Sequence, residues 1–214
     1  SHDGIGLNPV RGILSTSQMD GLVSSTLAHG GRVSYKQNAD FSQSPYELNI
    51  NYFDALSDPF SHESLALQVR RFLTAQSILL SLRGLPGIYF HSLVGSRNWT
   101  AGMVESGQNR TINREKLQLN ALETDLQTPG SLREQVFTGY RKLLQQRAAS
   151  SAFHPQAAQQ ILSMGRGIFA VLRTSLDGSQ RMLCLHNVTS ETQSAGVWSI
   201  PPLTALWVPN AEGY

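Results

Sequence analysis

A histidine and an aspartate stand side by side at the start of the chain, as His2 and Asp3, and a glycine-rich segment (residues 4–6) follows them directly. Ionisable residues in front of glycines are typical of a buried strand that opens into an active-site loop. An aspartate there could stabilise a developing positive charge, and a histidine N–H could donate to a hydroxyl or a carboxylate. Ser1, His2 and Asp3 cannot form a hydrolase triad, because consecutive side chains do not converge in the required geometry. The pair could also be a structural strand end or a disordered terminus.

The composition indicates a globular protein without a resident cofactor. The chain has 214 residues and a formal net charge of +2 at pH 7, and its length suffices to bury a core. The short basic pairs at 70–71 and 141–142 indicate solvated helix faces rather than a nucleic-acid-binding stripe. The single cysteine, Cys184, excludes a disulfide framework and a cysteine metal cluster, and the histidines lack metal-ligand spacing. We therefore expect no cofactor, no metal and no nucleic-acid partner.

No segment of the sequence is long and apolar enough to span a membrane, since polar residues interrupt the most apolar stretch at 73–82. The sequence shows no signal peptide, although a truncated chain could have lost one. We therefore expect no membrane partner and a cytoplasmic location.

The first 150 residues have the pattern of an α/β protein. Ser17 and Ser61 can each cap an amphipathic helix, and Ser131 and Glu134 form a capping box. A short apolar run at 85–91, bounded by glycine and proline, is typical of a buried strand, so helix, turn and strand indicate a parallel α/β unit. The sequence predicts helices at 17–29, 61–83 and 131–148, and irregular structure at 33–57 (with a short extended stretch at 46–52) and 92–130.

After Ser150 the pattern changes to strands, and Asp177-Gly178 supplies a hairpin turn between two of them. The sequence predicts strands at 160–164, 167–174, 181–188 and 203–208. An α/β segment followed by antiparallel strands indicates two domains, residues 1–150 and 151–214, with a boundary near Ser150.

Several blocks of the sequence, in the same order, resemble one enzyme family. They are spread over the first 114 residues and lie at 1–9, 44–56, 85–90, 95–98 and 109–114. Together they resemble the sucrose phosphorylase-like subfamily of glycoside hydrolase family 13, the α-amylase superfamily. Within the subfamily, the block that contains Tyr46 and Glu47 is closer to glucosylglycerate and glucosylglycerol phosphorylases, because sucrose phosphorylases commonly carry glutamine where Glu47 stands.

The resemblance implies a fold. The family has an eight-stranded (β/α)8 TIM barrel with its active site at the C-terminal ends of the strands, followed by a small antiparallel β domain. This chain would be the C-terminal part of such an enzyme, with a subdomain inserted in the barrel near residues 8–58.

The resemblance also implies roles for site residues. Asp3 would stabilise the cation-like transition state, and His2 would grip sugar hydroxyls beside it. Arg110 would hold the glucosyl unit, with a surface salt bridge as the alternative, whereas Arg114 would be structural. Tyr46 and Glu47 would lie on the acceptor side. The family's nucleophile and acid/base lie on strands that this chain lacks, so no carboxylate here replaces them.

The function that follows is retaining α-glucosyl phosphorylase activity, in which glucose passes between a small acceptor (glycerate, glycerol or a sugar) and inorganic phosphate. The partners would be a small glucoside, phosphate and the N-terminal remainder of the barrel, and the chain alone would be inactive. Two alternatives stay open: a non-catalytic sugar-binding or structural module, and a family 13 hydrolase, in which water rather than phosphate attacks the glucosyl-enzyme.

Overall fold

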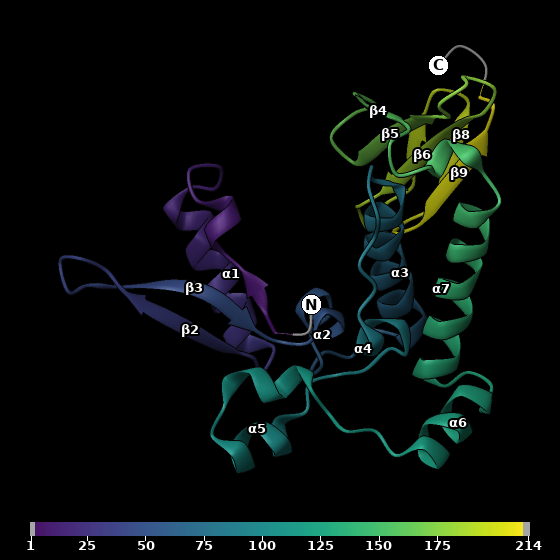
Figure 1. Ribbon diagram of the computed structural model, residues 1–214. Helices are drawn as coiled ribbons and strands as arrows, with labels where there is room; N and C mark the ends of the chain where they lie inside the picture. The colour runs from purple at the N-terminus through teal and green to yellow at the C-terminus, as the bar shows by residue number, and fades with distance from the viewer. Residues whose placement is uncertain (1–2, 212–214) are drawn as a thin grey trace. The chain divides into compact units, whose positions relative to one another are not determined.

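The computed structural model of the protein describes residues 3–211 and has two compact units, each of which is described here by itself (Figure 1). The first contains the residues up to Glu63 together with Tyr89–Glu134, and the second contains Ser64–Ile88 and the residues from Gln135 onward. Helix α3 (Leu65–Ser81) and most of helix α7 (Leu132–Ala148) therefore belong to the same unit as the C-terminal strands. The predicted boundary near Ser150 stays a prediction.

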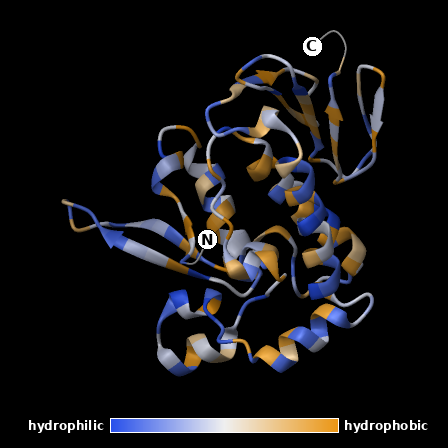
Figure 2. Ribbon diagram, turned by 45° about the vertical axis from the view of Figure 1, so that its right-hand side comes forward, coloured by the Kyte–Doolittle hydropathy of each residue, from blue (hydrophilic) through white to orange (hydrophobic). Residues whose placement is uncertain are grey.

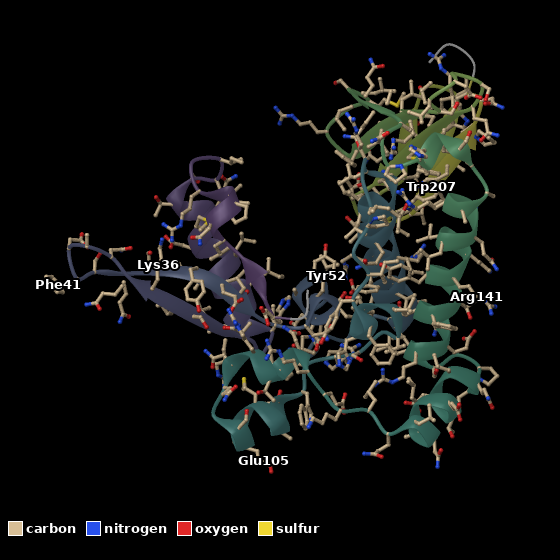
Figure 3. The ribbon with its side chains drawn as sticks, in the orientation of Figure 1. Lys36, Phe41, Tyr52, Glu105, Arg141 and Trp207 are labelled. Atoms are coloured by element: carbon tan, nitrogen blue, oxygen red, sulfur yellow. The ribbon has the colours of Figure 1, made fainter. Side chains whose placement is uncertain are left out.

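An antiparallel sheet in the order β1-β3-β2 forms the centre of the first unit. Its strands are β1 (Ile5–Gly6), β2 (Arg32–Gln37) and β3 (Gln43–Asn49). The prediction of irregular structure at 33–57 was therefore wrong, because β2 and β3 form a hairpin that extends away from α2 and α5 (Figure 1). The extended stretch expected at 46–52 is confirmed for residues 46–49, which belong to β3. Their polar residues hide the strand signal in the sequence, whereas backbone pairing does not depend on side-chain type. Phe41, in the turn, has a φ of 66° and is exposed (Figure 3).

Helix α1 (Thr16–Ala28) packs against this sheet and begins one residue earlier than expected. The predicted cap, Ser17, lies inside the helix. Ser15 is the N-cap instead, since its hydroxyl accepts from the Gln18 amide while the Gln18 side chain accepts from the Ser15 amide. The core beneath α1 consists of Leu7, Leu48 and Ile50, with flanking residues of α1 and the hairpin.

Short helices make up the remainder of the first unit. They are η1 (Asn8–Val10), α2 (Tyr52–Leu56), α4 (Phe90–Leu93), α5 (Thr100–Ser106), η2 (Asn109–Asn113) and α6 (Leu119–Gln127). Two predictions are corrected here: residues 92–130 are largely helical, and residues 85–91 form no strand, since α4 begins at Phe90. A strand exists only through backbone hydrogen bonds to a neighbour, and nothing in residues 3–211 pairs with this segment.

Two long helices, α3 (Leu65–Ser81) and α7 (Leu132–Ala148), accompany the C-terminal strands. The predicted start of α7 is confirmed, because the Ser131 hydroxyl accepts from the Glu134 amide at 3.0 Å. Helix α3 is shorter than predicted: Ser64 precedes it, and the Ser61 hydroxyl donates to the Asp58 carbonyl instead of capping it.

The four predicted C-terminal strands are confirmed and form one antiparallel sheet in the order β4-β5-β6-β9. They are β4 (Ala158–Leu162), β5 (Ile168–Thr174), β6 (Arg181–Asn187) and β9 (Ala205–Pro209), and η3 (Ser151–Phe153) precedes them. The predicted turn joins β5 to β6, with Gly178 at a φ of 72°. A small hairpin of β7 (Gln193–Ala195) and β8 (Trp198–Ile200) was not predicted. Figure 2 shows hydrophobic residues (orange) in both the helices and the strands, and β5 and β6, the two central strands of this sheet, are buried along almost their whole length.

A fully buried arginine joins α3 to the sheet. Arg173 of β5 donates to the carbonyls of Ser81 and His154 at 3.0 Å and of Ala158 at 3.2 Å, and burial lowers its pKa. These bonds satisfy a carbonyl at the end of α3 that would otherwise lack a partner. The buried Nε1 of Trp207, unlike the nitrogens of Arg173, has no hydrogen-bond partner among the described residues, although the Trp207 ring packs on Phe153 (Figure 3).

His186 of β6 is a second buried link to α3. Its Nδ1 lies 2.9 Å from the Phe169 carbonyl oxygen, and its Nε2 lies 3.1 Å from the Ser77 hydroxyl. A carbonyl can only accept, so Nδ1 carries the proton and Ser77 donates to Nε2. Burial lowers the pKa of His186 below its usual 6.5, because the charged imidazolium would lose its hydration there.

We expect the free energy of unfolding to fall as the pH drops below about 6.5, because unfolded His186 then takes up a proton that the folded ring does not. One such group contributes a slope of at most about 1.4 kcal/mol per pH unit. Urea unfolding between about pH 8 and pH 5 measures the slope. The substitution His186→Gln should reduce the slope of the unfolding free energy against pH, whereas His62→Gln, at an exposed site, should leave the slope unchanged. Burial also lowers the pKa of His91, so His91 makes its own contribution to the slope. An unchanged slope in His186→Gln would contradict the assignment.

The described helices include none that is both long and apolar enough to cross a membrane.

Candidate functional site

Glu47 lies at the centre of the candidate site, on β3 and within the first unit. It is opposite Gly6 of β1 and Ser34 of β2, next to an irregularity in the β2–β3 pairing. Only 9% of its side chain is exposed, and the Asn49 side-chain amide donates to Oε2 at 2.9 Å. The Ser34 hydroxyl in turn donates to Asn49 Oδ1 at 2.6 Å. The sheet therefore holds this carboxylate in a fixed orientation.

Arg110 of η2 binds Glu47 with both arms of its guanidinium. Its Nε donates to Oε2 at 3.0 Å and its Nη2 donates to Oε1 at 3.2 Å. This paired geometry is specific to arginine and stronger than a neutral hydrogen bond. The Glu47 bond is the main cause that raises the pKa of Arg110, and Asp3 and Tyr46 add to the effect. Arg110 is thus fixed by Glu47 and keeps one nitrogen for another partner.

Asp3 lies on that remaining side of Arg110. Its Oδ2 is 3.7 Å from Arg110 Nη1, and its Oδ1 accepts from Arg114. The Asn113 side-chain amide donates to the Asp3 backbone carbonyl at 2.5 Å. A quarter of the Asp3 side chain (26%) is exposed, so the carboxylate is held by two cations but still reaches solvent.

A glycine makes this arrangement possible. A Cβ at Gly4 would lie 2.5 Å from the Leu48 carbonyl oxygen and 2.8 Å from Glu47 Cγ. Only glycine therefore allows the backbone after Asp3 to pass so close to β3. The glycine that follows the His-Asp pair in the sequence places Asp3 beside Glu47.

The structure brings together three of the five predicted site residues, Asp3, Glu47 and Arg110. Tyr46 lies next to them: its backbone carbonyl accepts from the Leu7 amide, and its side chain is half-buried. His2 lies outside the described residues.

Sequence reasoning missed Asn113 and Tyr89. The Tyr89 hydroxyl donates to the Asn113 carbonyl at 2.6 Å, and burial is the main cause that raises its pKa. Tyr89 was placed in a buried strand, which hid its role, but Asn113 belongs to the 109–114 block and could have been noticed there. The two support the segment that carries Arg110 and Arg114.

A second polar network fixes the segment that follows β3. Asp54 is buried and accepts from Arg97 Nη1 at 2.8 Å and from the Asn98 amide at 2.7 Å. Asn98 also accepts from the Asn51 amide at 2.7 Å. Burial raises the pKa of Asp54, and the bonds from Asn98 and Arg97 oppose that change. The sequence block at 95–98 thus anchors the end of β3 and α2.

The groups of this cluster can form hydrogen bonds with a polyhydroxylated ligand. Fixed carboxylates accept from hydroxyls, and a guanidinium donates to them. The described residues contain no group of three histidine, cysteine, aspartate or glutamate side chains that could hold a metal ion. The expectation that the protein uses no cofactor stays a prediction.

The comparisons with known proteins agree with this reading. No protein-family model matches the chain, but curated relatives do. Glucosylglycerate phosphorylase of Spirochaeta thermophila is 46% identical over 189 residues, which cover 88% of this chain and 32% of the relative. The enzyme of the same name from Allomeiothermus silvanus is 44% identical over 207 residues, covering 97% of this chain and 37% of the relative. The Escherichia coli enzyme is 36% identical over 200 residues.

This chain is a homologue of the glucosylglycerate phosphorylases. The resemblance seen in the sequence blocks is thereby confirmed. The chain spans about a third of the length of these relatives, 32% and 37% of the first two.

Solved structures show the same relationship at the level of the fold. Sucrose 6F-phosphate phosphorylase from Thermoanaerobacter thermosaccharolyticum matches 99% of this chain with 38% of its own, at a TM-score of 0.75 and 18% identity. Cyclic α-maltosyl-(1→6)-maltose hydrolase from Arthrobacter globiformis matches 67% of this chain with 30% of its own, at a TM-score of 0.52 and 19% identity. The predicted fold class is therefore confirmed at the level of the fold: the helices and antiparallel sheets of this chain match 38% of the first of these proteins and 30% of the second.

Proposed function

We propose that this chain supplies the sugar-gripping side of a retaining α-glucosyl phosphorylase that transfers glucose between glycerate and inorganic phosphate. Two observations support the proposal. The chain is 46% and 44% identical to enzymes named glucosylglycerate phosphorylase. Its Asp3, Arg110 and Glu47 form one connected cluster of fixed charges.

Asp3 is the residue proposed to act on the transition state. A retaining glucosyl transfer passes through an oxocarbenium-like state, and a negative charge held nearby stabilises it. Arg110 and Arg114 keep the Asp3 carboxylate in place without enclosing it. His2, outside the described residues, is proposed to bind a hydroxyl of the same sugar.

Arg110 and Glu47 bind each other directly, so they are proposed to line adjacent parts of the glucose site. Arg110 would donate to the distal hydroxyls of the glucosyl unit, and Tyr46 and Glu47 would border the acceptor. The two carboxyl groups of a retaining mechanism lie about 5 Å apart across the bond that breaks. We assign neither to this chain, and the remainder of the barrel is proposed as the partner that supplies them.

The relatives' name favours glycerate over glycerol or a sugar as acceptor. The proposal therefore includes a small glucoside and phosphate as substrates, and a cytoplasmic location.

A chimeric enzyme tests the proposal. The segment of the Spirochaeta thermophila enzyme that aligns with this chain is replaced by it, and release of glucose 1-phosphate from glucosylglycerate is measured. We expect activity that depends on phosphate. Glucose release at the same rate without phosphate would favour a hydrolase, and a folded chimera without either activity would contradict the proposal.

The chain by itself provides the complementary test. It should not turn over glucose 1-phosphate with glycerate, glycerol or fructose, because it lacks both catalytic acids. Turnover by the purified chain would contradict this assignment, since a nucleophile would then have to lie within it.

A further inference from the structure

The second unit contains a cavity of about 300 Å³ that is separate from the cluster around Glu47. Residues of α3, α7 and the segment that leads into β9 line it: Arg70, Leu73, Thr74, Ser77, Gly139, Lys142, Leu143, Gln146, Leu203, Thr204 and Ala205. Its volume is at the lower end of the range of small-molecule sites.

The two helices that line the cavity come into close contact at a glycine. A Cβ at Gly139 would lie 2.3 Å from Leu73 Cδ1, so only a glycine allows α7 to approach α3 this closely. Leu203, which also lines the cavity, has a φ of 50°, in the left-handed region that a bulky residue rarely adopts.

The charge of the lining is one-sided. Arg70 on α3 and Lys142 on α7 both line the cavity, and no aspartate or glutamate does. Within residues 3–211, neither cation makes an ion pair or a side-chain hydrogen bond. Both side chains are exposed, so an anion that enters the cavity from solvent meets two cations that no acidic residue of the lining neutralises.

The remaining lining is mostly apolar. Leu73, Leu143 and Leu203 provide a hydrophobic surface, and Gln146 adds an amide donor. Ser77 is not available as a donor to a ligand, because its hydroxyl is bonded to His186 Nε2. The cavity therefore combines two cations, Arg70 and Lys142, which can bind an anion, with an apolar surface that can contact an apolar group.

We propose that this cavity binds a small organic phosphate, whose phosphoryl group lies between Arg70 and Lys142 and whose apolar part contacts the three leucines. This goes beyond the proposed transferase activity, since none of these residues belongs to the sugar site. Phosphate is favoured over a single carboxylate because a phosphoryl group carries a charge of about −1.5 to −2 at pH 7, which matches two cations, and offers three acceptor oxygens.

Calorimetric titration of the chain with phenyl phosphate tests the proposal. All titrations use an Arg110→Gln background, so that the sugar site does not take up the probe, and ionic strength is kept constant with sodium chloride. We expect saturable binding, tighter for phenyl phosphate than for inorganic phosphate. Arg70→Gln and Lys142→Gln should each weaken the Kd for phenyl phosphate about tenfold or more, the effect of losing one charge-assisted contact.

Arg141→Gln is the matched control, since Arg141 is an exposed cation on the same helix that does not line the cavity (Figure 3). It should leave the Kd unchanged, and Lys142→Arg should retain binding, which separates charge from folding. The proposal is overturned if phenyl phosphate shows no saturable binding, or if Arg141→Gln weakens binding as much as the two cavity variants do. It is also overturned if neither Arg70→Gln nor Lys142→Gln changes the Kd.

Discussion

Asparagine in place of Asp3 is expected to lower kcat of the chimeric enzyme by about 10²–10³-fold, with a much smaller change in KM. Removing one preorganised group that faces developing charge typically has this effect. The charge difference between carboxylate and amide matters most when the sugar is most cationic, which is in the transition state rather than the bound substrate. The loss should therefore fall on kcat.

Asp3 could also affect activity by holding the segment that carries Arg110 and Arg114 in place. Asp3 also binds Arg114 and lies near Arg110, so Asp3→Asn could disturb the segment that carries both arginines. Arg114→Gln removes the stronger of these contacts and leaves the carboxylate in place. If Asp3 acts mainly through position, the two variants should lose similar activity. If its charge acts on the transition state, Asp3→Asn should be the more damaging by at least about tenfold.

Asp20→Asn is the matched control for the chemistry of the substitution, because Asp20 is an exposed aspartate on α1 outside the cluster. It should leave kcat and KM unchanged. If the Asp3→Asn variant had full activity and an unaltered Tm, the assignment of Asp3 to the site would be contradicted.

The site could be predicted to the extent that its residues lie in short contiguous blocks. Asp3, Glu47 and Arg110 each stand in a distinctive segment, and the segments converge in the structure. What the blocks did not show is that Glu47 and Arg110 bind each other, because residues 63 positions apart reveal a contact only through the fold. Asn113 and Tyr89 were missed for the same reason: their contribution is a bond to a backbone carbonyl, which any polar residue could make.

The fold was predictable where local signals and packing agree. The start of α7 follows from a serine and a glutamate three residues apart, and the β5–β6 turn follows from Asp177-Gly178. The β2–β3 hairpin was not predictable as a whole, since polar residues make up most of its strands and their contact with the core is limited to residues near its base, such as Val33 and Leu48. The run at 85–91 has the composition of a strand without the neighbour that a strand needs.

Glutamine in place of Glu47 is expected to raise KM for the glucosyl donor about tenfold in the chimeric enzyme. The two bonds to Arg110 are charge-assisted, and such bonds contribute about 1.5–3 kcal/mol. A neutral amide can accept only one of them, so Arg110 loses its fixed orientation. Glu105→Gln, at an exposed site on α5 (Figure 3), is the control and should change nothing.

The same variant decides whether Glu47 acts through Arg110 or touches the acceptor itself. With only 9% of its side chain exposed and both oxygens bonded, Glu47 has little left to offer a ligand. If Glu47 acts through Arg110, Glu47→Gln should alter KM for the glucosyl donor. The further substitution Arg110→Lys should then add little to that change in KM, since both substitutions remove the same pair. Contact with the acceptor would instead alter KM for glycerate in the reverse reaction, and the two substitutions would then be additive.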